Sequence, residues 1–384
     1  MNNEKNLLED IERLRGFACL LVLIHHISFI CPLRYVYNVV PYRLLLGESG
    51  VFIFFAISGF VVTLSLREKI AKLSGNVFLE RLNSAKSMIV AFYKRRFFRI
   101  APVMLFCVLM TGLYLCISEP NFDWLRSWLR ATPELFCGVF QYSEELYQFT
   151  DKLHNGGMGP LWTLAVEGQF YLLWPIILLM CKNNNARAIM SLLTGCLFLF
   201  VVQPIVAGFV GIKYYAIYGH LPCLCLGAFF AFLYTDDIGK NINKTSAKII
   251  TAFLALIIWY YPNSIERTYF CRMPLHIAAT FLVVFCAFVK DSFNFPILGR
   301  FFRFLGSRSY SFYVMQTVLA NYIIFFTNSI YFPKESLSEY EFYLYQFIIF
   351  IVALFITTEL VYRFIERPFR RLGYNNSIDN TDKK

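Results

Sequence analysis

Long apolar segments follow one another along the whole chain, separated by short polar connections. A stretch of about 20 apolar residues is long enough to cross the hydrocarbon core of a bilayer as an α-helix. The pattern therefore predicts an all-α fold, a polytopic membrane bundle of about ten transmembrane helices. The expected spans cover residues 14–33, 50–66, 98–118, 160–181, 186–211, 213–234, 247–262, 273–290, 309–328 and 342–363.

The placement of Lys and Arg orients this bundle. Short cytoplasmic loops of membrane proteins carry an excess of positive charge. With the N-terminus inside, 27 of the 36 basic residues fall on cytoplasmic segments or at the cytoplasmic ends of spans, and 9 fall on the other side. Segment 67–99 alone holds nine of them, whereas segment 119–159 carries six acidic and three basic residues. We therefore expect both termini in the cytoplasm.

Composition agrees with a multi-pass protein of the cell inner (plasma) membrane. The chain is 58% hydrophobic and only 16% charged, with a mean hydropathy of +0.53. We expect one transmembrane domain over residues 1–372 and a disordered cytoplasmic tail over 373–384, because the last residues are polar.

The charge and the cysteines exclude two classes of protein. The net charge of +11 does not indicate nucleic-acid binding, since the basic residues lie along membrane borders and form no stripe on a soluble domain. Membrane lipid or an anionic cytosolic substrate is the expected partner. The eleven cysteines are scattered, without the spacing of a disulfide framework or of metal ligands, and we expect no metal.

Arg15 and His26 are separated by eleven residues, about three helical turns, and so lie on one face of the first span. Ionisable groups inside a membrane are costly and by default mark a functional site. We therefore expect a catalytic role for both residues. In the alternative interpretation, Arg15 anchors the helix end and His26 bonds a neighbouring helix.

Glu167 lies in the segment GPLWTLAVEGQFYLLWP at about the same expected depth as His26. A carboxylate beside an imidazole makes it a better proton acceptor, as general-base catalysis requires. A structural ion pair would use the same residues. Trp162, near the outer end of this segment, is a candidate for stacking on a sugar, although aromatic residues at interfaces are usually belt residues.

The segment FYKRRFFRIAP carries Arg95, Arg96 and Arg99 at the inner border of the third span. Closely spaced guanidinium groups can bind phosphates bidentately. A positive-inside anchor is the alternative. On the outside, His154 in HNGGMGP is a candidate for contact with a substrate hydroxyl, and an ordinary solvated histidine is its alternative.

Six segments occur in the order found in the membrane acyltransferase-3 family: LRGFACLLVLIHH, GVFIFFAISGF, FYKRRFFRIAP, GPLWTLAVEGQFYLLWP, SYSFYVMQ and YRFIERPF. The chain resembles this family, which includes O-antigen and exopolysaccharide O-acetyltransferases, over about residues 10 to 370. The family's motif of Arg, ten residues and His falls on Arg15 and His26. Its basic motif falls on Arg96 and Arg99.

The acidic aromatic motif of the family falls on Trp162, Glu167 and Tyr171. One position departs from the pattern, because Gln316 stands where the family usually has histidine. An amide can form hydrogen bonds but cannot accept a proton at ordinary pH, so an orienting or substrate-binding role is expected for Gln316.

The resemblance implies transfer of an acyl group, expected to be acetyl, from cytosolic acyl-CoA to a hydroxyl of an envelope glycan or lipid-linked sugar. His26, oriented by Glu167, would act as base or acyl carrier, and the basic motif would hold phosphates of the donor. Some members carry a further soluble domain, so a separate soluble partner could complete the transfer. A proton-coupled secondary transporter and a non-catalytic lipid-binding or assembly subunit are the alternatives.

Overall fold

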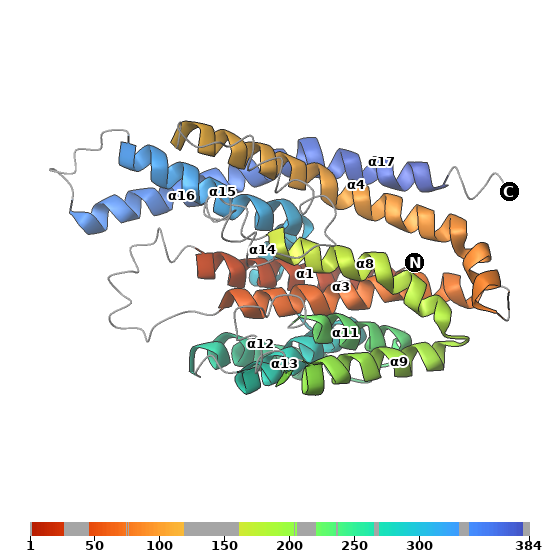
Figure 1. Cartoon of the computed structure of the whole chain (residues 1–384). Coiled ribbons are helices and arrows are strands. Elements are labelled where there is room, and N and C mark those ends of the chain that lie inside the picture. The colour runs from red at the N-terminus through yellow and green to blue at the C-terminus, as the bar shows by residue number, and fades with distance from the viewer. Residues whose placement is uncertain are drawn as a thin grey trace. The chain divides into compact units, whose positions relative to one another are not determined.

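The computed structural model describes residues 2–26, 46–73, 75, 77–118, 161–202, 204–205, 220–235, 237–264, 269–329 and 338–378. This part of the chain consists of helices and short connections and contains no β-strand (Figure 1). The predicted all-α class is therefore confirmed for the residues described.

Fourteen helical elements are described, two of which are π-helical turns (η3 and η5) that continue α9 and α16. Their bounds are α1 Asn2–His26, α3 Leu46–Ala71, α4 Phe78–Ser118, α8 Leu161–Met180, α9 Asn184–Leu197, η3 Phe198–Val202, α11 Leu221–Leu233, α12 Lys244–Ser264, α13 Tyr269–Phe288, α14 Leu298–Ser307, α15 Ser309–Ser329, α16 Glu339–Val361, η5 Tyr362–Glu366 and α17 Arg367–Ile378.

Five stretches of the described chain are long and apolar enough to cross a membrane. They are Leu46–Ala71, Phe78–Ser118, Thr163–Met180, Asn184–Val202 and Tyr340–Asn375. Each of the ten predicted spans overlaps a helix, but the count of ten transmembrane helices and the cytoplasmic position of both termini stay predictions.

The chain divides into two compact units, which are described separately. Unit 1 comprises residues 1–22, 45–93 and 169–309, and unit 2 comprises residues 23–44, 94–168 and 310–384. Boundaries fall within α1, α4 and α8, and between the first two residues of α15. The single domain over 1–372 stays a prediction, and α17 continues to Ile378, inside the segment expected to be a disordered tail.

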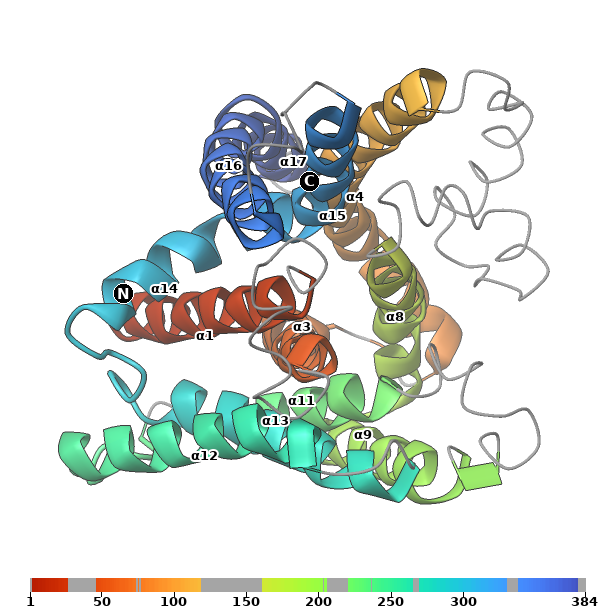
Figure 2. The same cartoon turned by 90° about the vertical axis from the view of Figure 1, so that its left-hand side faces the viewer.

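In unit 1, α3 packs closely against α11, as Figure 2 shows. A Cβ atom added to Gly59 of α3 would lie 1.9 Å from the backbone oxygen of Leu224, and one added to Gly227 of α11 would lie 2.3 Å from that of Ala56. Both positions therefore require glycine. Small residues at helix crossings let backbones approach closely, and the resulting van der Waals packing contributes to helix association in lipid.

The first helix meets α14 in the same way. A Cβ atom on Gly16 would lie 1.9 Å from the backbone oxygen of Phe302, and one on Gly306 would lie 1.6 Å from that of Glu12. The Phe17 ring packs beside the ring of Phe302, with centroids 5.7 Å apart. This crossing fixes the half of α1 that precedes the candidate catalytic residue His26.

Two buried arginines close the C-terminal end of α8 in unit 1. Arg187 donates to the backbone oxygens of Leu178 and Cys181, each at 3.0 Å. Arg81 donates to the oxygen of Cys181 at 2.7 Å. The last carbonyls of a helix have no partners within the helix, and the negative end of the helix dipole favours cations there. The arginines therefore satisfy groups that burial would otherwise leave unpaired.

In unit 2, hydroxyl and amide groups tie α15 to its neighbours. Tyr322 donates to the backbone oxygen of Met110 on α4 at 2.7 Å. Gln346 of α16 donates to the hydroxyl of Thr327 at 2.6 Å. Helix α15 is thus bonded to helices that precede and follow it in the chain.

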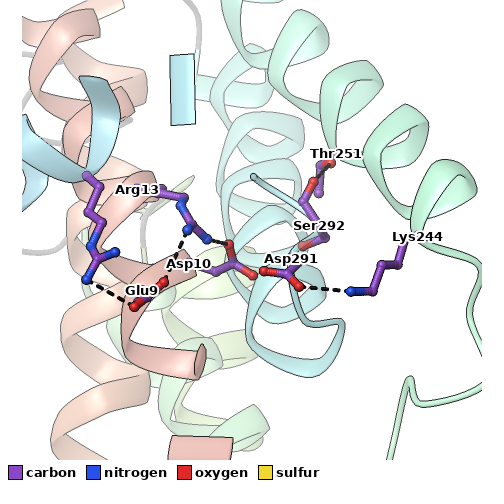
Figure 3. A network of polar contacts seen from close by, with 8 residues as sticks. Glu9, Asp10, Arg13, Lys244, Thr251, Asp291 and Ser292 are labelled. Carbon is purple, nitrogen blue, oxygen red and sulfur yellow. Dashed lines mark hydrogen bonds and ion pairs between the residues drawn. The ribbon is translucent and has the colours of Figure 1, made fainter. Parts of the chain in front are cut away.

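A polar network surrounds the start of α1 in unit 1 (Figure 3). Arg13 donates to Asp10 at 2.6 Å and pairs with Glu9 at 3.2 Å. The backbone N–H of Asp291 also donates to the Asp10 carboxylate, and Lys244 pairs with Asp291 at 3.1 Å. Asp10 is only 1% exposed. Burial raises the pKa of Asp10 from 3.8 to about 6, although Arg13 acts in the opposite direction.

We predict that Gly59→Ala destabilises the protein, because the new methyl group meets backbone and not a movable side chain. Overpacking of this kind costs about 1–3 kcal/mol. The unfolding temperature in detergent measures it. Gly195→Ala is the matched control, since its Cβ would meet only side-chain atoms of Cys225 and Leu226 at 3.3 Å. Equal effects of the two substitutions would contradict this account.

We also predict that stability depends on pH through Asp10. The pKa of Asp10 is higher in the folded than in the unfolded chain. Protonation of Asp10 therefore contributes to the free energy of unfolding fully below about pH 4, and this contribution is lost as the pH rises through about 6. From 3.8 to about 6 this amounts to about 3 kcal/mol. As the pH rises from 4 to 8, the unfolding temperature of the native chain should therefore fall relative to that of Asp10→Asn.

The exposed residue Asp237 provides the control for that measurement. Its hydrogen bond with Lys240 lowers its pKa, so Asp237→Asn should give a small difference of opposite sign. A stability difference between the native chain and Asp10→Asn that stays constant over the pH range would refute the role of Asp10.

Candidate active site

His26 and Gln316 lie together in unit 2. His26 ends the described part of α1, and Gln316 is on α15. The Gln316 side chain interacts with the His26 imidazole, and its Nε2 donates to the backbone oxygen of Tyr313 at 3.1 Å. Gln316 is 1% exposed. Within the described residues, His26 Nδ1 and Gln316 Oε1 are buried atoms that have no hydrogen-bond partner.

These two atoms can accept hydrogen bonds, and the imidazole nitrogen can also accept a proton. A neutral imidazole nitrogen without a proton accepts a hydrogen bond and can take the proton from it, whereas an amide oxygen accepts a hydrogen bond without becoming protonated. Buried polar atoms are normally satisfied, so unpaired ones need an explanation. Binding of a ligand with adjacent hydrogen-bond donors, one of them a hydroxyl, would provide it.

His26 has two described neighbours. His26 interacts with His25, whose ring centroid lies 5.4 Å away, and with Gln316. Glu167, on α8, interacts electrostatically with Tyr310. The pairing of Glu167 with His26 therefore stays a prediction, and the structure supplies Gln316 as the neighbour on another helix.

Tyr310 gathers charged side chains at the beginning of α15. Its hydroxyl donates to the backbone oxygen of Ile100 at 2.7 Å. Arg99 and Glu366 interact electrostatically with it, as does Glu167. Two of the residues selected from the sequence, Arg99 and Glu167, thus share one neighbour in unit 2, although they belong to different helices.

Glu366, the last residue of η5, caps the N-terminus of α15 within unit 2. Its Oε2 accepts hydrogen bonds from the Ser311 hydroxyl at 2.5 Å and from the Ser311 backbone N–H at 3.3 Å. A carboxylate at a helix N-terminus satisfies a backbone donor and opposes the positive end of the dipole. Arg370 lies 3.9 Å from its other oxygen.

One further contact near Gln316 carries no signal in the sequence. Thr163 of α8 donates to the hydroxyl of Tyr313 at 3.1 Å, and the backbone oxygen of Tyr313 holds the Gln316 amide. A threonine and a tyrosine 150 residues apart have no spacing that predicts their contact. The consequence is that α8 supports the turn of α15 that carries Gln316.

The arginines of the basic segment lie on α4 and are half-buried. Arg95 interacts electrostatically with Tyr374 of α17. Arg96 and Arg99 follow on the same helix, so the three cations remain close in sequence and in space. Their role in phosphate binding stays a prediction.

Two other candidates belong to unit 1. Arg15 is half-buried on α1, eleven residues before His26, and the helix between them is continuous. Tyr171 of α8 is buried, and its hydroxyl donates to Ser58 of α3 at 3.2 Å. Trp162 belongs to α8, but its side chain is outside the described part, and His154 lies outside the described residues altogether.

No group of three or more His, Cys, Asp or Glu side chains suited to a metal ion occurs within the described ranges. Cys223 is fully buried, with its sulfur 3.0 Å from Nδ1 of His276. A buried thiol of this kind behaves as a small apolar group with one weak hydrogen bond.

Comparison with known proteins adds to this geometry. The O-acetyltransferase OatA of Staphylococcus aureus (strain NCTC 8325) is 25% identical over 386 aligned positions, which cover 96% of this chain and 58% of that protein. The peptidoglycan O-acetyltransferase OatA of Listeria monocytogenes is 24% identical over 391 positions, which cover 96% and 56%. The chain thus spans less than three fifths of these relatives. No solved structure matches significantly.

The family described as an acyltransferase domain matches residues 8–362, nearly the whole chain. The matched region includes His26, Glu167, Tyr310 and Gln316, whereas Glu366, Arg370 and Tyr374 follow it. On this evidence the chain belongs to the acyltransferase family whose motifs its sequence resembles.

Proposed function

We propose that this chain is a membrane O-acyltransferase that moves an acyl group, acetyl in the first instance, from cytosolic acyl-CoA to a hydroxyl of a cell-envelope glycan. Family membership supports the reaction class, and the two relatives named above are O-acetyltransferases. The multi-pass character of the chain supports a position in the inner (plasma) membrane.

The observation that carries the proposal is the buried pair of His26 Nδ1 and Gln316 Oε1, which has no partner in the described chain. Both atoms accept hydrogen bonds when the imidazole is neutral with its proton on Nε2. A sugar offers adjacent donors, such as a hydroxyl beside a second hydroxyl or an amide N–H. A thioester offers none at its reacting centre, so the pair suits the acceptor better than the acyl group.

The reaction then follows from the chemistry of the imidazole. His26 Nδ1 removes the proton from the acceptor hydroxyl as its oxygen bonds to the thioester carbonyl carbon. The carbon–sulfur bond breaks, and the thiolate of CoA leaves with the electron pair and takes up the proton from His26. Covalent transfer through an acyl-imidazole is the variant of this route in which His26 itself is the nucleophile.

The cationic residues serve the donor in this scheme. Arg95, Arg96 and Arg99 bind the phosphates of acyl-CoA near the inner border, where guanidinium groups make bidentate contacts. Arg15 helps to position the donor. Glu167 supports this reaction through its electrostatic interaction with Tyr310.

The acceptor is proposed to be a glycan or lipid-linked sugar outside the cell membrane. One relative is named a peptidoglycan O-acetyltransferase. Trp162, Tyr171 and His154 are the residues that we assign to acceptor binding, in addition to Gln316. A separate soluble partner that completes the transfer is compatible with this scheme, and purified protein tests whether the chain alone suffices.

We predict that His26→Gln lowers acetyl transfer from radiolabelled acetyl-CoA to cell-wall glycan by about 10²–10⁴-fold, the usual contribution of a general base. The assay uses the purified full chain in liposomes and measures CoA release together with labelled glycan. His25→Gln is the matched control and should retain activity. Normal turnover by His26→Gln would refute the catalytic assignment.

The same assay separates the enzyme from a transporter. Accumulation of glycan inside liposomes without CoA, in place of CoA release, would overturn the proposed reaction class. Unchanged unfolding temperatures of the two histidine variants would show that a loss of activity does not arise from misfolding.

We predict that Gln316→Glu shifts the acidic limb of the pH profile of kcat/KM to higher pH. A carboxylate in place of the amide stabilises the imidazolium and raises the pH needed to obtain neutral His26, by about one unit or more. Gln316→Met removes the acceptor oxygen at similar size and should lower kcat/KM without this shift. An unshifted profile for Gln316→Glu would exclude contact between the two side chains during catalysis.

A further inference from the structure

The last helix, α17, carries three arginines on one face. Arg367, Arg370 and Arg371 occupy an arc of about 100° around the helix axis at 3.6 residues per turn. All three side chains are exposed. A cationic face of this kind lies within unit 2, directly after the π-helical turn η5.

These arginines have little acidic compensation. Arg370 lies 3.9 Å from Glu366, but the other oxygen of that carboxylate is already occupied by Ser311. Arg367 and Arg371 take part in no ion pair with the described residues. The face therefore keeps most of its positive charge available for an anionic partner.

The remaining surface of this segment exposes large apolar side chains. Phe364 is 71% exposed, Phe369 is 38% exposed and Leu372 is 49% exposed. Phe369 and Leu372 lie on the side of α17 opposite to the arginines. A water-soluble anion would use only the arginines and would leave these apolar side chains in water. A phospholipid supplies both a phosphate and acyl chains.

The length of α16 places this surface near the headgroups. Its 23 residues extend about 35 Å, slightly more than the hydrocarbon thickness of about 30 Å. Within unit 2, α17 lies beside α4, and a Cβ atom on Gly373 would come within 2.7 Å of Phe98 (Figure 1). The Arg95–Tyr374 interaction joins the same two helices.

We propose that the arginine face of α17 binds the headgroups of anionic phospholipids in the inner leaflet, while its apolar side contacts their acyl chains. Basic helices with exposed aromatic and aliphatic residues bind membrane surfaces by these two interactions together. The proposal is independent of the catalytic role of His26. Each basic residue near an anionic surface strengthens attraction about fivefold, so three contribute about 100-fold.

The test uses the purified full chain in detergent, titrated with phosphatidylglycerol and separately with phosphatidylcholine, with bound lipid counted by native mass spectrometry. Arg367→Gln, Arg370→Gln and Arg371→Gln are combined in one variant. We expect its affinity for phosphatidylglycerol to fall by one to two orders of magnitude, more steeply at low salt than at high salt. Its affinity for phosphatidylcholine should stay the same.

The matched control removes three exposed cations from unit 1 by Lys72→Gln, Lys86→Gln and Lys182→Gln. This variant should bind phosphatidylglycerol within about twofold of the native chain, because its three lysines belong to separate segments of the chain and form no common cationic face. Equal losses in both variants, or no loss in the α17 variant, would overturn the proposal.

Coenzyme A, titrated into the same proteins, separates lipid from the proposed donor. Unchanged affinity of the α17 variant for coenzyme A supports a lipid surface. Loss of coenzyme A binding with phosphatidylglycerol binding retained would overturn the lipid assignment and assign these arginines to the phosphates of the donor. Equal unfolding temperatures of all variants establish that the helices remain folded.

Discussion

The structure depends on finding partners for the polar groups at helix ends, because an apolar environment offers little water to bind them. Arg81 and Arg187 take this role at the C-terminus of α8, and Glu366 takes it at the N-terminus of α15. In each case the sign of the charge opposes the helix dipole. Ionic side chains thus stabilise helix ends in both units, while glycine contacts allow the helices to approach.

The capped end of α15 has a direct relation to the candidate active site. Ser311 donates a hydrogen bond to the Glu366 carboxylate, the Tyr313 hydroxyl accepts one from Thr163, and Gln316 lies within the next turn. The side chain beside His26 is therefore carried by a helix segment that is bonded on several sides. A rigid support of this kind suits catalysis, which requires reacting groups to be held within a fraction of an ångström.

Hydrophobic patterning predicted the positions of the helices well, because apolar runs such as 50–66 and 342–363 must be helical in lipid. It also indicated His26 as a functional residue, because an ionisable ring inside an apolar segment is costly to bury. It could not select Gln316 as a neighbour of His26, since equal depth leaves the rotation of each helix undetermined. The expected pairing of His26 with Glu167 stays a prediction. Asp10 precedes the first predicted span at 14–33, so the hydrophobic pattern gives no sign of its burial. The capping by Glu366 joins residues 55 positions apart, which no local pattern encodes.

The π-helical turn η5 has a consequence for the direction of the chain. In a π-helical turn a backbone N–H bonds to the carbonyl five residues earlier, and such turns often coincide with functional sites. Sharp kinks in helices commonly arise at turns of this kind. A change of direction between the long apolar α16 and the short cationic α17 would therefore be taken up at η5, and the regular hydrogen bonding of both helices would be kept.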